Sequence, residues 1–242
     1  MQACPGSGRP TPALVLSPPA VERVRSGEVL RILAIGSSST AGAGASRPEM
    51  TYPAQLARRL VEALGEGTIE ITNAGLNGES APATLKRLDA FLAQGDKPDL
   101  VLWQVGTNDV IFGGTPERLR ALVRQGLEAT AKADVATTII DQQYFPLILD
   151  VAKYERFVAA VDEVAVERKA PLLRRYAMMK QWASDDPESF KGLFAWDRFH
   201  MNDTGYACLA EQLAGTIAAA VRAARAPVAA SPPPARPQVP QR

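Results

Sequence analysis

Residues 100–105 read Leu-Val-Leu-Trp-Gln-Val, an almost unbroken apolar run that ends at Gly106. A strand with one face in water alternates apolar and polar side chains, whereas a strand buried on both faces is apolar nearly throughout. The run is therefore typical of a central strand in a sheet that helices cover on both sides. It favours a parallel sheet, because strands of this kind belong almost only to α/β proteins.

Other apolar runs along the chain alternate with amphipathic helical patterns. Strand-like runs occupy residues 30–35, 69–73, 135–140 and 171–173, and helices are predicted over residues 52–64, 84–93, 116–132, 154–169 and 203–224. Strands that alternate with helices are joined by right-handed crossovers into a mostly parallel sheet. We therefore predict an α/β fold with five strands.

The two ends of the chain differ in composition from this alternating part. The first 20 residues contain five prolines and little periodicity, and residues 226–242 are rich in proline and alanine. Segments of this kind bury too little apolar surface to fold. We predict a disordered or loosely packed segment over residues 1–26, one folded domain over residues 27–225, and a disordered tail over residues 226–242.

Charge and hydropathy exclude several classes of partner. The 242 residues carry 27 basic and 26 acidic side chains, a balance that gives no support to nucleic-acid binding. We predict no transmembrane segment, since no stretch approaches the roughly 20 apolar residues that span a bilayer. The start also lacks the charged and apolar regions of an export signal. The compartment stays open: periplasmic or secreted if the N-terminus is truncated, otherwise cytoplasmic. The oligomeric state is open too.

The chain has two cysteines, Cys4 and Cys208, and their positions suggest no site. Cys4 belongs to the proline-rich start, whereas Cys208 lies in the apolar pattern of the last predicted helix. Neither has the spacing of metal ligands, so we predict no metal site. We expect no disulfide between them and interpret Cys208 as a small buried apolar residue.

Functional residues of a parallel sheet gather beyond the carboxyl ends of its strands. The first strand is followed by Gly36-Ser37-Ser38-Ser39-Thr40, and a serine on such a turn is suited to act as a nucleophile. An ordinary Gly/Ser loop or an anion-binding turn is the alternative. The second strand is followed by a loop with Gly78, whose backbone N–H could face a substrate. After the third strand, Asn108 could donate to an oxyanion or form an Asx turn.

His200 is the only histidine of the chain, and Asp197 precedes it by three residues. Histidine is the side chain best suited to proton transfer near neutral pH, and a carboxylate can orient its ring. Serine, histidine and aspartate are the parts of a nucleophilic triad. The alternative is a loop that only caps the final helix through Asn202 or Asp203.

These four segments, in this order, resemble the SGNH hydrolases, also called the GDSL esterase/lipase family. The resemblance covers residues 31 to about 220. It rests on Gly-x-Ser, Asn-x-Gly-x-x-Gly, Gly-x-Asn-Asp and Asp-x-x-His, which begin at Gly36, Asn73, Gly106 and Asp197. It implies a three-layer, flavodoxin-like α/β/α fold and a carboxylic ester hydrolase without metal or organic cofactor. The substrates implied are small acyl esters, acetylated sugars or lipids, including thioesters.

The same resemblance implies a role for each residue. Ser38 would be the nucleophile, His200 the general base and acid, and Asp197 the carboxylate that orients the histidine. The N–H groups of Ser38 and Gly78 and the Asn108 amide would form the oxyanion hole.

Three alternatives to this reading of the site stay open. Ser37 stands where the family has the aspartate of Gly-Asp-Ser, and Ser39 is the other candidate nucleophile. The same residues would also serve an acyltransferase. A flavodoxin-like module that binds an anion at the first turn is the non-enzymatic alternative. The segment after the fourth strand, residues 141–149, is expected to be either a wall of the acyl pocket or a packed loop.

Overall fold

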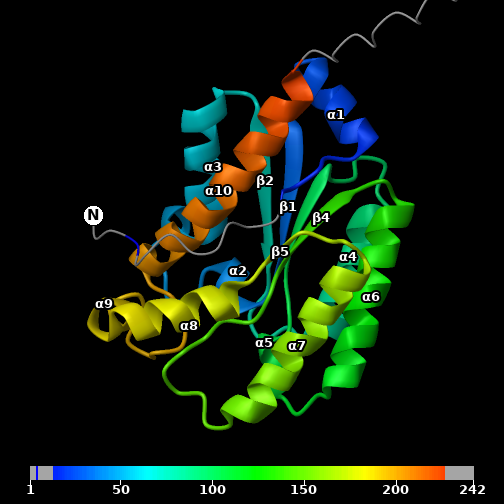
Figure 1. The fold of residues 1–242 in the computed structure, drawn as a ribbon. Coiled ribbons are helices and arrows are strands. Elements are labelled where there is room, and N and C mark those ends of the chain that lie inside the picture. Colours follow the sequence, from blue (N-terminus) through cyan, green and yellow to red (C-terminus); the bar gives the residue numbers. More distant parts are fainter. Residues whose placement is uncertain (1–3, 5–12, 227–242) are drawn as a thin grey trace, which may run out of the picture.

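The computed structural model describes residue 4 and residues 13–226. Its centre is a five-stranded sheet in the order β2-β1-β3-β4-β5, and every neighbouring pair is parallel (Figure 1). The strands are β1 (Leu30–Gly36), β2 (Ile69–Gly75), β3 (Leu100–Gln104), β4 (Ala136–Ile140) and β5 (Leu172–Leu173). The five strand-like runs therefore form the five strands, each with small shifts at its ends.

The central strand β3 is buried along its whole length, as its apolar run predicts. Its Trp103 packs against Gly126, which lies inside helix α6 (Pro116–Lys132). A Cβ on Gly126 would lie 2.2 Å from the indole ring, so only glycine lets this helix approach the sheet so closely. Glycine inside a helix costs about 1 kcal/mol relative to alanine, a cost that the close packing of Trp103 offsets.

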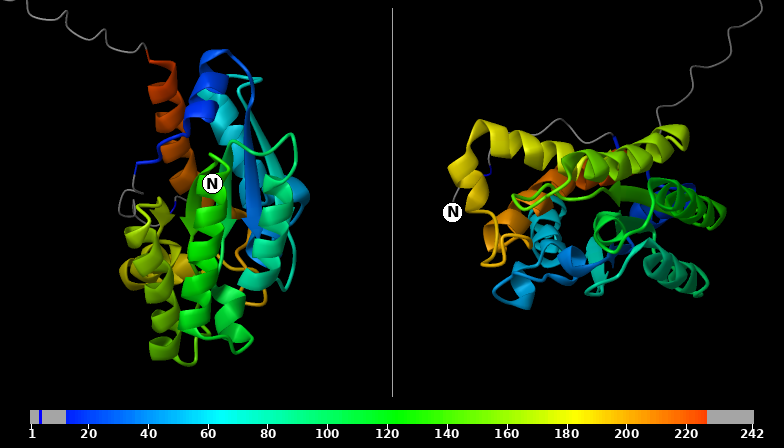
Figure 2. Two further views of the ribbon diagram at one scale, coloured as in Figure 1. Left: turned by 90° about the vertical axis from the view of Figure 1, so that its right-hand side faces the viewer. Right: turned by 90° about the horizontal axis from the view of Figure 1, so that it is seen from below.

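Helices cover both faces of the sheet, and Figures 1 and 2 show the layers. One face carries α3 (Tyr52–Leu64) and α10 (Asp203–Arg225), which pack against each other. The other face carries α4 (Ala81–Leu92), α6 and α7 (Val151–Glu167), packed side by side. This is the predicted three-layer α/β/α arrangement. None of the helices in the described part is long and apolar enough to cross a membrane.

Short elements follow the carboxyl ends of the strands, the end that the right-hand view of Figure 2 faces. They are α2 (Ser38–Ala41), the 3-10 turn η1 (Pro48–Met50), α5 (Thr107–Ile111), α8 (Arg175–Asp185) and α9 (Pro187–Lys191). The sequence did not predict them. Four of these elements have one or two turns and show too little periodicity to be recognised, whereas α8 has about three turns but no clear separation of apolar and polar faces.

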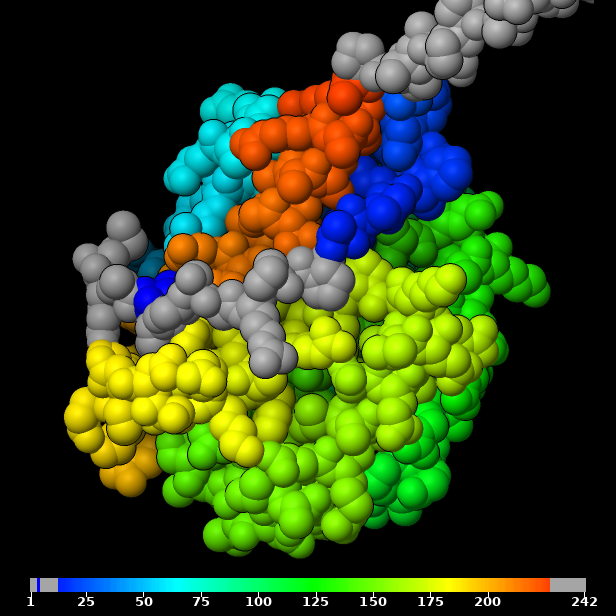
Figure 3. Space-filling view, viewed as in Figure 1, coloured from blue at the N-terminus to red at the C-terminus, as the bar shows by residue number. Residues whose placement is uncertain are grey.

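The N-terminal boundary of the folded part lies earlier than predicted. Helix α1 (Pro18–Arg25) packs beside α10, as Figure 3 shows, and Leu14 and Leu16 are buried in the core. The Arg25 guanidinium also donates to the carbonyl of Ala224 at 3.0 Å. Residues 13–26 are therefore packed, contrary to the expectation of a loose segment. The other predicted disordered residues, 1–3, 5–12 and 227–242, lie outside the described part.

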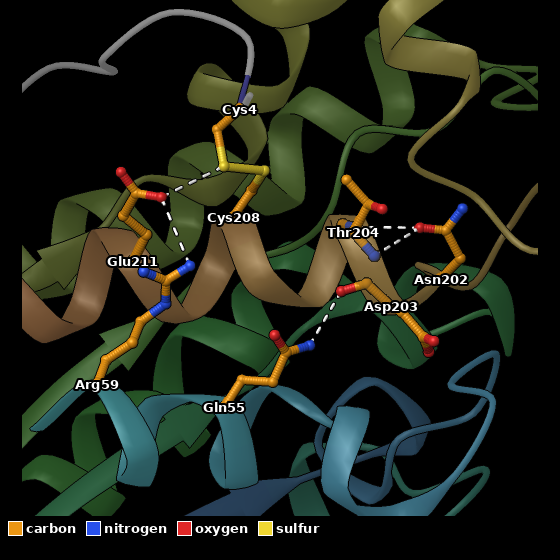
Figure 4. Close-up of a disulfide and its surroundings, with 9 residues drawn as sticks. Cys4, Gln55, Arg59, Asn202, Asp203, Thr204, Cys208 and Glu211 are labelled. Carbon is orange, nitrogen blue, oxygen red and sulfur yellow. Dashed lines mark hydrogen bonds and ion pairs between the residues drawn. A yellow bond between two sulfur atoms is a disulfide. The ribbon is translucent and has the colours of Figure 1, made fainter. Parts of the chain in front are cut away.

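Cys4 and Cys208 form a disulfide, so our expectation of two separate thiols was wrong (Figure 4). Their Cα atoms are 5.5 Å apart although the residues are separated by 204 positions. Separation in sequence does not limit distance in space, and Cys4 lies against the buried side of α10. The bond ties the start of the chain to α10, beside the ion pair of Arg59 and Glu211 (3.7 Å).

We expect the Cys4→Ser variant to lose about 2–4 kcal/mol of unfolding free energy, the usual contribution of a disulfide. The bond restricts the unfolded chain over almost its whole length. Denaturant unfolding with and without a reductant measures the effect. The reductant should destabilise the wild type and leave the variant unchanged. Equal stability of the wild type under both conditions would contradict the prediction.

Candidate active site

The carboxyl end of β1 brings Ser38 to the lone histidine of the chain. β1 ends at Gly36 and α2 begins at Ser38, so the serine stands on a sharp turn between strand and helix. Its Oγ lies 2.8 Å from Nε2 of His200, although the two residues are 162 positions apart. The contact is within hydrogen-bond range for proton transfer between the two groups.

Asp197 holds the other side of the imidazole. Its Oδ2 lies 2.6 Å from Nδ1 of His200, and its Oδ1 accepts the backbone N–H groups of Phe199 and His200. Burial acts to raise the pKa of this carboxyl, but these hydrogen bonds outweigh burial and hold the pKa below its ordinary value. Asp197 is therefore ionised at neutral pH. It keeps the proton of the neutral ring on Nδ1, which leaves Nε2 free to accept from Ser38.

The histidine loop is fixed by the cap of the last helix. Asn202 is the N-cap of α10, and its side-chain oxygen accepts the N–H groups of Thr204 and Gly205. Its Nδ2 donates back to the carbonyls of Gly192 and Phe194. Of the two residues considered as the cap, Asn202 and Asp203, the structure therefore selects Asn202. Because it is only two residues from His200, it also limits how far the imidazole can move.

The three neighbouring serines have different partners. Ser37 donates through both its N–H and its hydroxyl to Oε1 of Gln104 at the end of β3 (2.9 and 3.0 Å). Ser39 donates to Oε1 of Gln143 at 3.3 Å. Of the three, only Ser38 faces His200. Ser37 stands where the family has its aspartate, and its hydrogen bonds to Gln104 hold the turn in place.

Asn108 lies on the short helix after β3, next to the turn of Ser38. Gly106 precedes this helix in the left-handed region (φ 103°), and a Cβ there would lie 2.4 Å from the Gln142 amide. Nδ2 of Asn108 donates one hydrogen to the Glu79 carbonyl at 2.7 Å. An amide nitrogen carries two hydrogens, so a second donor is available to a ligand.

The loop after β2 lies against the same turn. The N–H of Leu76 donates to the carbonyl of Gly36 (3.0 Å), and Gly78 adopts a left-handed conformation with φ 80°. Both oxygens of the buried Asp109 accept the Ala81 N–H, which ties this loop to the segment after β3. Within the described residues, neither the Ser38 N–H nor the Gly78 N–H donates to another backbone group. The segments after β1, β2 and β3 thus bring the predicted oxyanion donors to one edge of the sheet.

The model of the Non-GDSL lipase-like family matches residues 13–223. The chain belongs to this family. The family is distinguished by name from proteins with the Gly-Asp-Ser motif, and this chain has Ser37 where that motif has its aspartate. No sequence among the curated proteins matches the chain.

Solved structures of similar fold include several esterases. TesA superposes with a TM-score of 0.66 at 22% identity, over 77% of this chain and 97% of that one. A variant of Axe2, an acetyl-xylooligosaccharide esterase from Geobacillus Stearmophilus, gives 0.64 at 22% identity, over 80% and 96%. AlinE4, an SGNH-hydrolase family esterase, gives 0.58 at 26% identity, over 80% and 97%. The resemblance to the SGNH hydrolases and the predicted fold are thereby confirmed.

Gln143 is a residue of this site that the sequence did not reveal. It lies in the segment after β4, whose first residues, 141–143, are fully buried. Its Oε1 accepts from Ser39 and from Nη2 of Arg175 (2.7 Å), and its Nε2 donates to the Phe199 carbonyl (2.7 Å). The orientation of this amide is determined, because a guanidinium only donates and a carbonyl only accepts. Gln143 therefore links the serine turn to the histidine loop.

The partner of Gln143 is itself unusual. Arg175 is fully buried at the start of α8, and burial lowers the pKa of its guanidinium. The neighbouring Asp141 is buried as well, and burial raises the pKa of its carboxyl to about 7. Asp141 accepts the N–H of Tyr176 (3.0 Å). The start of the 141–149 segment is thus a packed polar layer and no part of a pocket wall.

We expect Gln143→Leu to lower kcat for ester hydrolysis about 10- to 100-fold with little change in KM, since small misplacements of reacting groups cost that much. Gln142→Leu is the matched control, because Gln142 is equally buried but its amide has no hydrogen-bond partner among the described residues. Steady-state kinetics and thermal unfolding of both variants measure the effect. A similar loss of kcat in both would show that Gln143 acts only through stability.

Proposed function

We propose that this protein is a serine esterase that hydrolyses carboxylic esters through an acyl-enzyme. The observation that carries the proposal is the continuous contact from Ser38 Oγ to His200 Nε2 (2.8 Å) and from Nδ1 to Asp197 (2.6 Å). Membership of a lipase-like family and the similarity to esterases agree with a carboxylic ester hydrolase.

Acylation begins when Ser38 Oγ attacks the ester carbonyl carbon and its proton passes to Nε2 of His200. Asp197 stabilises the imidazolium that forms. The carbonyl oxygen becomes an oxyanion, and the donors available to it are the N–H groups of Ser38 and Gly78 and the second hydrogen of Asn108. When the C–O bond breaks, Nε2 returns the proton to the leaving alkoxide. A thiolate leaves in the same way from a thioester.

Deacylation uses the same groups in reverse. A water molecule gives a proton to Nε2 of His200 and attacks the acyl carbon of the Ser38 ester. The oxyanion forms again at the same donors. Collapse releases the carboxylic acid, and the proton on Nε2 returns to Ser38 Oγ. Each step conserves charge and protons among Ser38, His200, the substrate and the attacking water, and Ser38 and His200 supply the nucleophile and the acid and base of the reaction.

The substrate classes that we propose are small acyl esters, acetylated sugars and lipid esters. Membership of a lipase-like family and the similarity to an acetyl-xylooligosaccharide esterase support these classes without choosing among them, because one fold serves many substrates. A panel of p-nitrophenyl esters of increasing chain length, with acetylated xylan included, separates them.

We also propose that the protein works in an oxidising compartment. The disulfide of Cys4 and Cys208 supports this, since structural disulfides persist mainly outside the reducing cytosol. Alkylation of thiols in intact cells, followed by mass spectrometry, tests it. Free thiols on most of the protein would contradict the proposal.

We expect Ser38→Ala and His200→Ala each to lower kcat for p-nitrophenyl acetate by at least about a thousandfold, since the members of a triad act as a unit. Far-UV circular dichroism should stay unchanged. A serine-directed fluorophosphonate should label one residue per chain, which peptide mapping should assign to Ser38. Labelling of Ser39, or wild-type turnover in Ser38→Ala, would contradict the assignment.

We expect Asn108→Ala to lower kcat about 100- to 1000-fold with a smaller effect on KM, the usual result of removing one oxyanion donor. The same substitution removes the hydrogen bond to the Glu79 carbonyl. Thermal unfolding of the variant therefore accompanies the kinetics. An unchanged kcat in a folded variant would exclude Asn108 from the oxyanion hole.

A further inference from the structure

The large apolar side chains that the protein exposes are concentrated near the candidate active site. Six of the nine that are exposed in the described part lie on the segments after β2, β3 and β4 and before His200. We call these six the apolar rim: Leu76, Ile111, Phe112, Leu147, Leu149 and Trp196. Three of them are strongly exposed, namely Leu149 (101%), Trp196 (95%) and Phe112 (65%). Side chains so exposed are not walls of a closed pocket.

The segments after β2 and β3 are tied directly to the site. Leu76 donates its N–H to the Gly36 carbonyl, two residues before the nucleophile. Phe112 lies one helical turn beyond Asn108 and donates its N–H to the Asn108 carbonyl at 2.8 Å. These two apolar side chains are therefore held close to the proposed oxyanion donors.

The other two segments are tied to the histidine. Trp196 directly precedes Asp197 in the chain. The segment after β4 carries Leu147 and Leu149 and also Phe145, whose ring packs on that of Phe199 with centroids 4.9 Å apart. Phe199 in turn packs on His200 at 4.7 Å. This segment forms the lower edge of the molecule in Figures 1 and 3.

The rim carries little net charge. Residues 110–114 and residues 142–149 include no charged side chain, whereas Glu79 follows Leu76 by three residues and Asp197 and Arg198 follow Trp196. An anionic surface would be held through clustered lysine and arginine side chains, and the four segments of the rim contain no such cluster. The rim therefore fits a partner without net charge. Its exposed tryptophan has the amphipathic ring that favours the boundary between lipid and water.

We propose that the apolar rim docks the enzyme on a neutral lipid surface that contains its ester substrate. A second copy of the chain seated on the rim would cover the segments that form the site and exclude substrate. A lipid surface that contains the substrate does not block access in this way, because docking brings the ester close to Ser38. Large exposed apolar patches commonly mark such interaction sites. The inference rests on the proposed esterase function and names the physical state of its substrate.

Binding is tested with unilamellar vesicles of phosphatidylcholine and the full chain carrying Ser38→Ala, so that no hydrolysis occurs. We expect the protein to float with the vesicles, and Leu149→Asp to weaken the partition about tenfold or more, since burying one leucine contributes at least that factor. Val166→Asp is the matched control. Val166 is 64% exposed at the far end of α7, about 22 Å along the helix from Val151.

Trp196 provides a second readout. The other two tryptophans, Trp103 and Trp182, are 0% and 1% exposed, so only Trp196 can change its surroundings on docking. We expect a blue shift of the emission when vesicles are added and no shift in Trp196→Phe. Adding phosphatidylglycerol or salt should change the partition little. Binding that requires phosphatidylglycerol and is lost in salt would overturn the proposal of a neutral surface.

Kinetics separate this inference from the esterase function itself. We expect Leu149→Asp to hydrolyse dissolved p-nitrophenyl acetate like the Val166→Asp control, but to hydrolyse a long-chain ester embedded in the vesicles about tenfold more slowly. Hydrolysis of the dissolved ester without any vesicle binding would overturn the docking surface and leave the esterase function standing. Vesicle binding without hydrolysis of either ester would overturn the esterase function instead. A wild-type dimer that Leu149→Asp converts into monomers would assign the rim to self-association and overturn the docking proposal.

Discussion

The parallel direction of all five strands is the constraint on which the site depends. Because the strands end at one edge, the residues that follow β1, β2 and β3 meet there, and hydrogen bonds such as that of Asn108 to the Glu79 carbonyl then join them. The hydrogen bond between Ser38 and His200 then closes the arrangement from the other end of the chain. The N-cap of α10 places His200 for this contact, so the sheet and its last helix jointly define the geometry.

Buried polar side chains hold this edge more firmly than apolar packing alone would. Gln104 anchors the turn before the nucleophile, and Gln143 joins that turn to the histidine loop. Burying the Arg175 charge costs several kcal/mol. Its hydrogen bond to Gln143 offsets part of this cost and fixes the orientation of one amide. We infer that these buried polar side chains lower the stability of the fold but fix the positions of the reacting groups.

The segments that carry the site also expose the large apolar side chains of the apolar rim to water. Side chains of this kind are normally buried in the core of a globular protein. The rim residues lie on segments that polar contacts hold in place, so their exposure does not follow from loose packing. A lipid surface as partner accounts for both the absence of a basic cluster in the rim and the position of the rim on the segments that carry the site. Helix α1 packs on the C-terminal end of α10, far from the site, whereas the disulfide joins Cys4 to the first turns of α10, near its N-cap Asn202.

The sequence by itself determined the α/β class, the strands and the long helices, because periodicity reports which faces are buried. It also singled out the serines after β1 and Asn108, since residues at the ends of parallel strands converge, and His200 with Asp197, since this is the only histidine and a carboxylate precedes it by three residues. The choice of Ser38 among the serines came from the resemblance to the SGNH hydrolases. Only the tertiary structure decided the disulfide, the packing of residues 13–26, the role of Gln143 and the partner of each serine. These depend on distances between segments far apart in the chain, which no local pattern encodes.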